Sequence, residues 1–248
     1  MGPQFVREFR DIMTAIEADE HVRVVVFDSA VEGFFLNHSD FFANFDDLKS
    51  IPPGPTGLES WPDILVRLTR APVVSIALIR GRATGNGSEI ALACDMTFVS
   101  REKAVLSQWE VGVGMVAGGG PMARLPLLDR PRTRTGSAPE LRRHWRRAGR
   151  SVWLREPGAA GRRARRASST RLATRIAAFD KWAIAKTKSL VNASLPPDVE
   201  MAAGWDACMA SVARPATQAR LKAFMELGFH KPGAAEDHLG AYLSRIGR

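Results

Sequence analysis

Apolar residues near the start of the chain recur at steps of three and four positions, which predicts an amphipathic helix with Pro3 in its first turn. Residues 21–27 form a short β-branched run, which predicts a strand buried on both faces. Residues 28–40 are predicted to form a loop. The apolar face of the first helix comprises Phe5, Phe9, Ile12, Met13 and Ile16.

The next part of the chain alternates between strand-like and helix-like runs. A Pro-Pro-Gly-Pro break at 52–55 precedes a predicted helix at 64–68. Strands that alternate with helices predict an α/β fold with a mainly parallel sheet. From residue 172 onward the pattern is almost wholly helical. The later elements expected before that point are a buried strand at 72–79, a glycine-bearing turn at 81–87, a helix at 88–94, and short strands at 96–99 and 104–107.

Residues 130–171 differ in composition from the rest of the chain. This segment contains fourteen arginines and two glutamates, a local charge of +12, whereas the remainder carries −3 of the total of +9. Its few branched aliphatic residues show no helical or strand period, so we expect disorder here. The predicted organisation is a core at 1–129, the atypical arginine-rich segment at 130–171, and a helical region at 172–248.

Two hypotheses account for the arginine-rich segment. A displaced reading frame in a gene rich in G and C would yield Arg, Ala, Gly and Pro, and the coding DNA would then show an alternative frame with an apolar pattern. Alternatively, the segment is a genuine insertion whose arginines, with Trp145 and Trp153, would bind RNA through phosphate contacts and stacking. Charge runs are more often solvated stretches, so nucleic acid is the weaker expectation for a partner.

The cysteine and histidine content excludes several classes of protein. Cys94 and Cys208 are too few for a disulfide framework, and the sequence has no CxxC, HExxH or Cys/His cluster, so no metal site is expected. The N-terminus has no basic-then-apolar leader, and no apolar run approaches the roughly 20 residues that span a bilayer. These features predict a reduced, cytoplasmic protein without a membrane segment.

Three sequence blocks follow one another in order within residues 3–128. The first is the strand at 22–27 with GFFLNHSDF at 33–41; the second is APVVSIALIRG at 71–81 with ATGNGSEIALACD at 83–95; the third is AVLSQWEVGVG at 104–114 with GGGPMARL at 118–125. Their order and spacing resemble those of the enoyl-CoA hydratase/isomerase (crotonase) superfamily. In that family a strand and a turn usually precede the helix that begins here at Pro3.

The resemblance implies a fold, a substrate and an assembly. The expected fold is a crotonase-like ββα spiral of the α/β class with a C-terminal helical region. The implied substrate is an acyl-CoA thioester, whose CoA is part of the substrate, so no separate cofactor is expected. Members of the family commonly form trimers and pairs of trimers, so a homotrimer or hexamer is expected.

The resemblance also assigns chemistry to four positions. Two backbone N–H groups would stabilise negative charge on the thioester oxygen, and the motif match gives these to Asn37 and Asn86. Glu89 and Glu110 occupy the two glutamate positions of the family's hydratases, whereas its isomerases generally keep only the later one. Paired carboxylates beside an apolar pocket can take a proton from water and deliver one to carbon, because burial raises their pKa toward neutrality.

The expected activity is therefore reversible hydration of a 2-enoyl-CoA, as in the enoyl-CoA hydratase-like lyases of fatty acid metabolism. The alternatives are an isomerase or another acyl-CoA-processing enzyme of this superfamily, an RNA-binding protein, and an inactive protein that retains the fold. A glutamate in a first helical turn is common, because it interacts favourably with the helix dipole. The catalytic assignment of Glu89 therefore depends on its surrounding motif. The substrate-binding residues implied by the resemblance are Leu36, His38, Asp40, Gly85 and Gly87.

Overall fold

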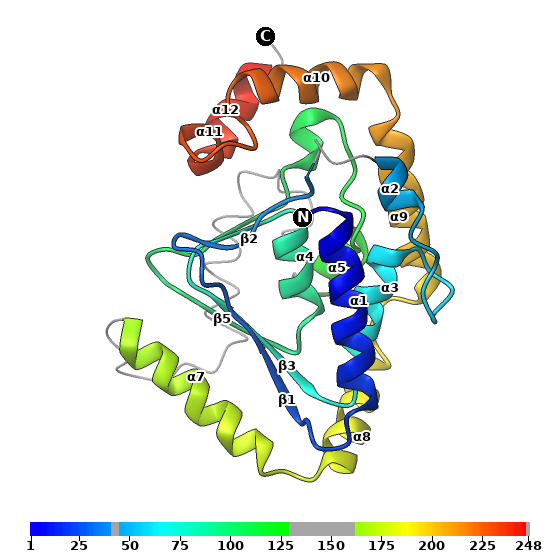
Figure 1. Ribbon diagram of the computed structural model, residues 1–248, viewed down its shortest axis with the longest axis vertical. Helices are drawn as coiled ribbons and strands as arrows, with labels where there is room; N and C mark the ends of the chain where they lie inside the picture. The colour runs from blue at the N-terminus through cyan, green and yellow to red at the C-terminus, as the bar shows by residue number, and fades with distance from the viewer. Residues whose placement is uncertain (41–44, 129–161, 247–248) are drawn as a thin grey trace.

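The computed structural model describes residues 1–40, 45–128 and 162–246. Within these residues, six short strands form two parallel three-stranded sheets (Figure 1). Consecutive strands enter alternate sheets, so the chain advances as a spiral in which each turn adds one strand to each sheet. One sheet has the order β1 (Val24–Phe27), β3 (Val74–Ile79), β5 (Met96–Val99), and the other has the order β2 (Phe34–Leu36), β4 (Arg82–Thr84), β6 (Val105–Ser107).

Helices make up most of the remaining structure, and Figure 1 shows α1 and α4 on one side of the β1–β3–β5 sheet and α7 beside β1 on the other. The helices that accompany the strands are α1 (Pro3–Ala18), α2 (Phe45–Lys49), α3 (Ser60–Arg70), α4 (Asn86–Ala93), the 3-10 helix η1 (Glu110–Val113) and α5 (Pro121–Leu128). The later helices are α7 (Arg162–Ala177), α8 (Lys181–Asn192), α9 (Asp198–Val212), α10 (Pro215–Glu226), α11 (Ala234–Asp237) and α12 (Leu239–Ile246). This arrangement confirms the α/β class and the spiral core.

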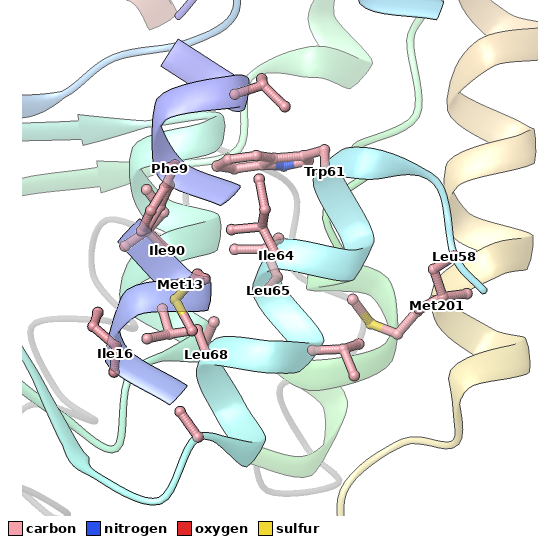
Figure 2. Packing of buried hydrophobic residues seen from close by; sticks show 14 of the residues in the cluster. Phe9, Met13, Ile16, Leu58, Trp61, Ile64, Leu65, Leu68, Ile90 and Met201 are labelled. Atoms are coloured by element: carbon pink, nitrogen blue, oxygen red, sulfur yellow. The ribbon is translucent and has the colours of Figure 1, made fainter. Parts of the chain in front are cut away.

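The largest apolar cluster lies between α1 and α3, where α3 is buried along almost its whole length (Figure 2). Phe9 of α1 packs edge-on against Phe27 of β1, with ring centroids 5.6 Å apart, and lies 6.5 Å from the ring of Trp61. Full burial of side chains of this size contributes about 1.5–3 kcal/mol each. These contacts fix Trp61 in the first turn of α3.

Several local predictions need correction. Residues 28–40 contain strand β2, and the turn predicted at 81–87 contains strand β4. Both strands have only three residues, too few to show a period of two. Strand β1 is an edge strand whose Val26 is exposed, so the expectation of burial on both faces is wrong. In α1, the buried face includes Val6 and excludes Ile12, which is exposed. The predicted apolar face of this helix is therefore wrong at these two positions.

The arginine-rich segment is partly described. Residues 129–161 lie outside the described residues, but 162–171 form the first part of α7, so the expectation of disorder is wrong for those ten residues. Arginine and alanine are strong helix formers, and this intrinsic propensity acts without an apolar period. The boundary predicted at 171/172 therefore falls inside a helix.

The later helices are attached to the spiral by buried polar contacts. Lys188 of α8 donates to Asp95 Oδ2 at 2.8 Å and to the carbonyl oxygens of Leu68 and Val73 at 3.1 and 2.9 Å. Asp95 also accepts from the backbone N–H and the hydroxyl of Ser75, both at 2.8 Å. A buried ammonium group is stabilised only when its donors are paired, so this network fixes where α8 docks.

None of the helices in the described part of the chain has the length and apolar character needed to span a membrane.

Candidate active site

The first turn of α4 lies directly against the end of strand β2 because residue 87 is glycine. A Cβ atom at Gly87 would lie 1.9 Å from the carbonyl oxygen of Leu36, so no other residue fits without moving the strand. This close approach brings Asn86 beside the loop that follows β2. The Ser39 hydroxyl donates to Asn86 Oδ1 at 2.8 Å and joins the loop to the helix.

Gly85 precedes α4 and has a φ of +53°, a conformation that glycine adopts without steric cost. A Cβ at this position would lie 3.0 Å from Glu110 Oε1 and 3.1 Å from His38 Cβ. Gly85 therefore keeps space open between the loop after β2 and the carboxyl group of Glu110. The sequence block around Gly85 thus has a structural role beside any chemical one.

Glu89 is 2% exposed, and both of its carboxylate oxygens accept hydrogen bonds. Trp61 Nε1 donates to Oε2 at 2.7 Å, and the Gly119 backbone N–H donates to Oε1 at 2.7 Å. Asn86 Nδ2 adds a weaker bond to Oε2 at 3.2 Å. Burial is the larger influence and raises the pKa of Glu89 above its ordinary value, and the three N–H donors offset part of this rise. The donors cannot accept a proton, so they hold Glu89 in one orientation and favour its ionised form.

Glu110 is 7% exposed and lies at the start of η1. Burial raises its pKa to about 8, and the nearby negative charge of Glu89 adds to this shift. With Nε2 oriented toward Glu110, the Gln108 amide donates to the two carboxyl oxygens at 3.1 and 3.0 Å and accepts from the Ser88 hydroxyl. Gln108 therefore joins Glu110 to Ser88 of α4.

Both glutamates line one cavity with a volume of about 40 Å³. By that measure a water molecule needs at least about 10–15 Å³, so the cavity has room for two or three waters. It lies between the α4 side of the spiral and helix α9. Its walls are formed by His38, Ser39, Leu48, Trp61, Asn86, Glu89, Trp109, Glu110, Met115, Gly118, Gly119, Trp205, Cys208, Met209 and Val212.

The predicted site residues divide into two groups in the structure. His38, Asn86, Glu89 and Glu110 line the cavity, and Gly85 and Gly87 shape the approach to it. Leu36, Asn37 and Asp40 are not part of its wall; the residues of that loop that reach it are His38 and Ser39. No cluster of three metal-ligating side chains occurs in the part of the chain that the structure describes.

Two donors to Glu89 and one apolar wall of this site were not predicted from the sequence. Trp61 donates to Glu89 from a helix that lies 28 residues upstream, and no spacing rule connects the two. The apolar wall from α9 comes from the second half of the chain, whose pattern predicts helices but not what they cover. The backbone N–H of Gly119 is a second donor to Glu89, and the glycine block at 118–120 does not predict this contact. The residues that α9 contributes are Trp205, Cys208, Met209 and Val212.

Comparison of the sequence with protein families matches residues 1–127 to the enoyl-CoA hydratase/isomerase model. The mouse mitochondrial enoyl-CoA hydratase domain-containing protein 2 is 32% identical over 126 residues, which are 51% of this chain and 42% of that protein. The crotonyl-CoA hydratase of Syntrophomonas wolfei is 30% identical over 126 residues, which are 50% of this chain and 46% of that protein. The match therefore spans less than half the length of these curated relatives.

Solved structures extend the likeness along nearly the whole chain. A Streptomyces avermitilis protein described as an enoyl-CoA hydratase superimposes with a TM-score of 0.83 at 32% identity, covering 98% of this chain and 88% of that one. An enoyl-CoA hydratase from Mycobacterium avium subsp. paratuberculosis superimposes with a TM-score of 0.69 at 20% identity, covering 90% of this chain and 85% of that one. At 20% identity, the superposition on the Mycobacterium protein shows a shared fold alone.

Proposed function

Because the chain belongs to the enoyl-CoA hydratase/isomerase family, we propose that it is a hydratase that adds water reversibly across the double bond of a 2-enoyl-CoA thioester. The observation that carries this proposal is the pair of buried carboxyl groups, Glu89 and Glu110, at one cavity of about 40 Å³. Hydration needs a water molecule between a group that accepts a proton and a group that delivers one. A water-sized cavity with a carboxyl group from each of two elements supplies that arrangement.

The surroundings of the two glutamates support different roles. Three N–H donors favour the ionised form of Glu89, which suits a base that takes a proton from water. Burial raises the pKa of Glu110 to about 8, so near neutral pH the proton of the pair resides on Glu110, which suits an acid. Burial raises the pKa of both glutamates, and the negative charge of Glu89 raises that of Glu110 further, which supports Glu110 as the acid and Glu89 as the base of the pair.

We propose that Glu89 and Glu110 each transfer one proton during hydration. Glu89 accepts a proton from water while the water oxygen bonds to the β carbon of the enoyl group. The electron pair of the double bond moves toward the thioester carbonyl, whose oxygen gains negative charge. Glu110 then delivers its proton to the α carbon, which restores the carbonyl. The product is a 3-hydroxyacyl-CoA, and the proton left on Glu89 returns to Glu110 before the next turnover.

Backbone N–H groups are proposed to stabilise the negative thioester oxygen. The Asn86 N–H lies in the first turn of α4, where backbone N–H groups have no partner within the helix and the helix dipole adds positive potential. The second donor is proposed to come from the loop after β2, predicted at Asn37. Of that loop, His38 and Ser39 reach the cavity, so their N–H groups are the alternative donors. Loss of one such donor typically costs about 3 kcal/mol of transition-state stabilisation.

The test is turnover of crotonyl-CoA, the 2-enoyl-CoA with a four-carbon acyl group, by the purified chain. We expect loss of the enoyl absorbance and formation of 3-hydroxybutyryl-CoA identified by mass spectrometry. A 3-enoyl-CoA that is converted only to its 2-enoyl isomer would indicate an isomerase instead. A salt-sensitive shift of RNA on a gel without turnover of either thioester would contradict the proposal and favour the RNA-binding alternative.

A further inference from the structure

A carboxylate from the C-terminal helices, Glu236, is directed into the loop that follows β2. Glu236 lies in α11 and is 5% exposed. Its carboxylate accepts from His38 Nε2 at 2.9 Å and from Asn37 Nδ2 at 3.2 Å. The backbone N–H of His230 donates to the same carboxylate at 2.9 Å. One buried side chain therefore bonds two consecutive residues of the loop and the segment that leads into its own helix.

The imidazole of His38 is held at both nitrogens and on its ring faces. Nδ1 lies 2.9 Å from the carbonyl oxygen of Ser39, and Nε2 faces Glu236. Both ring nitrogens therefore lie within hydrogen-bonding distance of a protein oxygen atom. The ring also packs against Trp109, Phe229 and His230, with centroid separations of 5.4, 4.2 and 4.6 Å. These contacts fix the loop side chain against the C-terminal helices.

Glu236 keeps its charge in spite of burial. Burial alone would raise its pKa, but the hydrogen bond from His38, the electrostatic interaction with that imidazole and the hydrogen bond from the His230 N–H bring the pKa below its ordinary value. An ionised carboxylate accepts stronger hydrogen bonds than a neutral group, so the loop is held firmly. No local sequence pattern predicts the contact between His38 and Glu236, because the two residues are 198 positions apart.

We propose that Glu236 is a positioning residue: by bonding His38 and Asn37, it holds the loop after β2 in the geometry in which that loop serves the thioester oxygen beside Asn86. This inference rests on the proposed hydratase function. It gives α11 a role in a reaction whose reacting groups all lie in the first half of the chain. Displacement of a catalytic group by about 1 Å costs on the order of a hundredfold in rate, so a loosened loop has a measurable effect.

The neighbouring Asp237 supplies a matched control. It lies in the same short helix and carries the same charge, but it is half-exposed and pairs with Arg82 at 3.3 Å on the surface. We expect Glu236→Gln to lower kcat for crotonyl-CoA about 10- to 100-fold with KM changed less than about threefold, because the loop acts on the transition state. Asp237→Asn should leave kcat within about twofold of the unaltered chain.

A double-variant comparison separates positioning from general loosening of the fold. If Glu236 acts through His38, then Glu236→Gln combined with His38→Gln should lower kcat by no more than about twofold beyond the worse single variant. Multiplicative effects of the two substitutions would overturn the inference. Equal kcat in Glu236→Gln and Asp237→Asn would overturn it as well.

Amide hydrogen exchange of residues 36–40 tests the inference separately from the proposed function, because it needs no turnover. We expect these amides to exchange about tenfold faster in Glu236→Gln than in Asp237→Asn, while amides of α3 remain unchanged. Unchanged exchange in the loop would overturn the role of Glu236. If the unaltered chain hydrates no enoyl-CoA but the loop responds as expected, the failure lies in the proposed function and the structural link stands.

Discussion

The spiral at residues 1–128 and the helices at 162–246 contribute to the same cavity in different ways. In the proposed reaction, the spiral provides the groups that react: Glu89, Glu110 and the backbone N–H of Asn86. The helices provide an apolar wall from α9 and a carboxylate, Glu236, that holds a loop of the spiral. Only the first region matches the family model, yet both enclose the site. The proposed chemistry is therefore concentrated in the spiral, whereas both regions enclose the cavity.

The largest expected effect separates the two regions most clearly. Glu89→Gln removes a proton acceptor while preserving side-chain shape, so kcat for crotonyl-CoA hydration should fall about 1000-fold, at the middle of the range for general acid–base catalysis. Glu226→Gln, at an exposed position of α10, is the matched control and should change kcat less than about twofold. Steady-state kinetics of both variants measures this. Comparable losses in the two variants would remove the distinction between the regions.

Two glycines offer a second contrast. Gly87→Ala forces a Cβ to within 1.9 Å of the Leu36 carbonyl oxygen, so strand and helix must separate. We expect a loss of about 3 kcal/mol of unfolding free energy and about a hundredfold fall in kcat. Gly204→Ala, in α9, meets nothing within 4 Å and should raise the unfolding free energy by up to about 1 kcal/mol. Urea unfolding measures both, and an unaltered or more stable Gly87→Ala would contradict the close approach.

The third prediction concerns the stability cost of the raised pKa at Glu110. In the unfolded chain this glutamate ionises near its ordinary pKa, whereas in the folded chain it stays protonated until about pH 8. The unfolded state therefore binds fewer protons between those values, and the stability of the folded chain declines as pH rises through this interval. Glu110→Gln removes that penalty. It should be more stable than the unaltered chain by on the order of 4 kcal/mol at pH 8, with a smaller difference near pH 5.

Urea unfolding at several pH values measures this difference. A stability difference that does not change with pH would show that Glu110 titrates normally in the folded chain. A functional residue whose removal stabilises the fold is an expected consequence of a charge-bearing group in a buried site.

The smallest effect tests the wall that the second region supplies. Trp205 of α9 lines the cavity and is partly buried. Trp205→Ala should enlarge the acyl site and raise kcat/KM for an eight-carbon enoyl-CoA about tenfold relative to crotonyl-CoA, since a few methylene contacts are worth roughly 1–3 kcal/mol. Trp182→Ala, at an exposed position of α8, is the control. An unchanged ratio of the two substrates would place the acyl group elsewhere.

The sequence allowed prediction of the parts of the fold that have long periods or specific motifs. The helix at α1, the strands β3, β5 and β6, and the helix at α4 follow from periodicity and glycine positions. Strands β2 and β4 were not predicted, because each lies beside glycines that are typical of a loop or turn, and their pairing is decided by distant chain segments. The start of α7 was hidden by its composition, since no apolar face identified a helix that packs against β1.

The site could be predicted only where one motif carries several of its residues. Gly85, Asn86, Gly87 and Glu89 lie within five positions, so one block identifies them together. The contacts of Glu89 with Trp61 and of His38 with Glu236 join residues 28 and 198 positions apart, which no local pattern encodes. The cavity-facing residue after β2 is a further example. His38, a predicted substrate-binding residue, lines the cavity together with Ser39, which the motif did not single out.

The central claim is that Glu110 acts as a protonated acid beside an ionised Glu89. The pH dependence of kcat/KM for crotonyl-CoA hydration tests it most directly, with the unaltered chain and Glu110→Gln measured side by side. We predict that activity of the unaltered chain falls as pH rises through about 8, where Glu110 loses its proton. The residual activity of Glu110→Gln should lack that decline. A rate that is constant through pH 9 in the unaltered chain, or a Glu110→Gln variant with the full rate, would contradict the account.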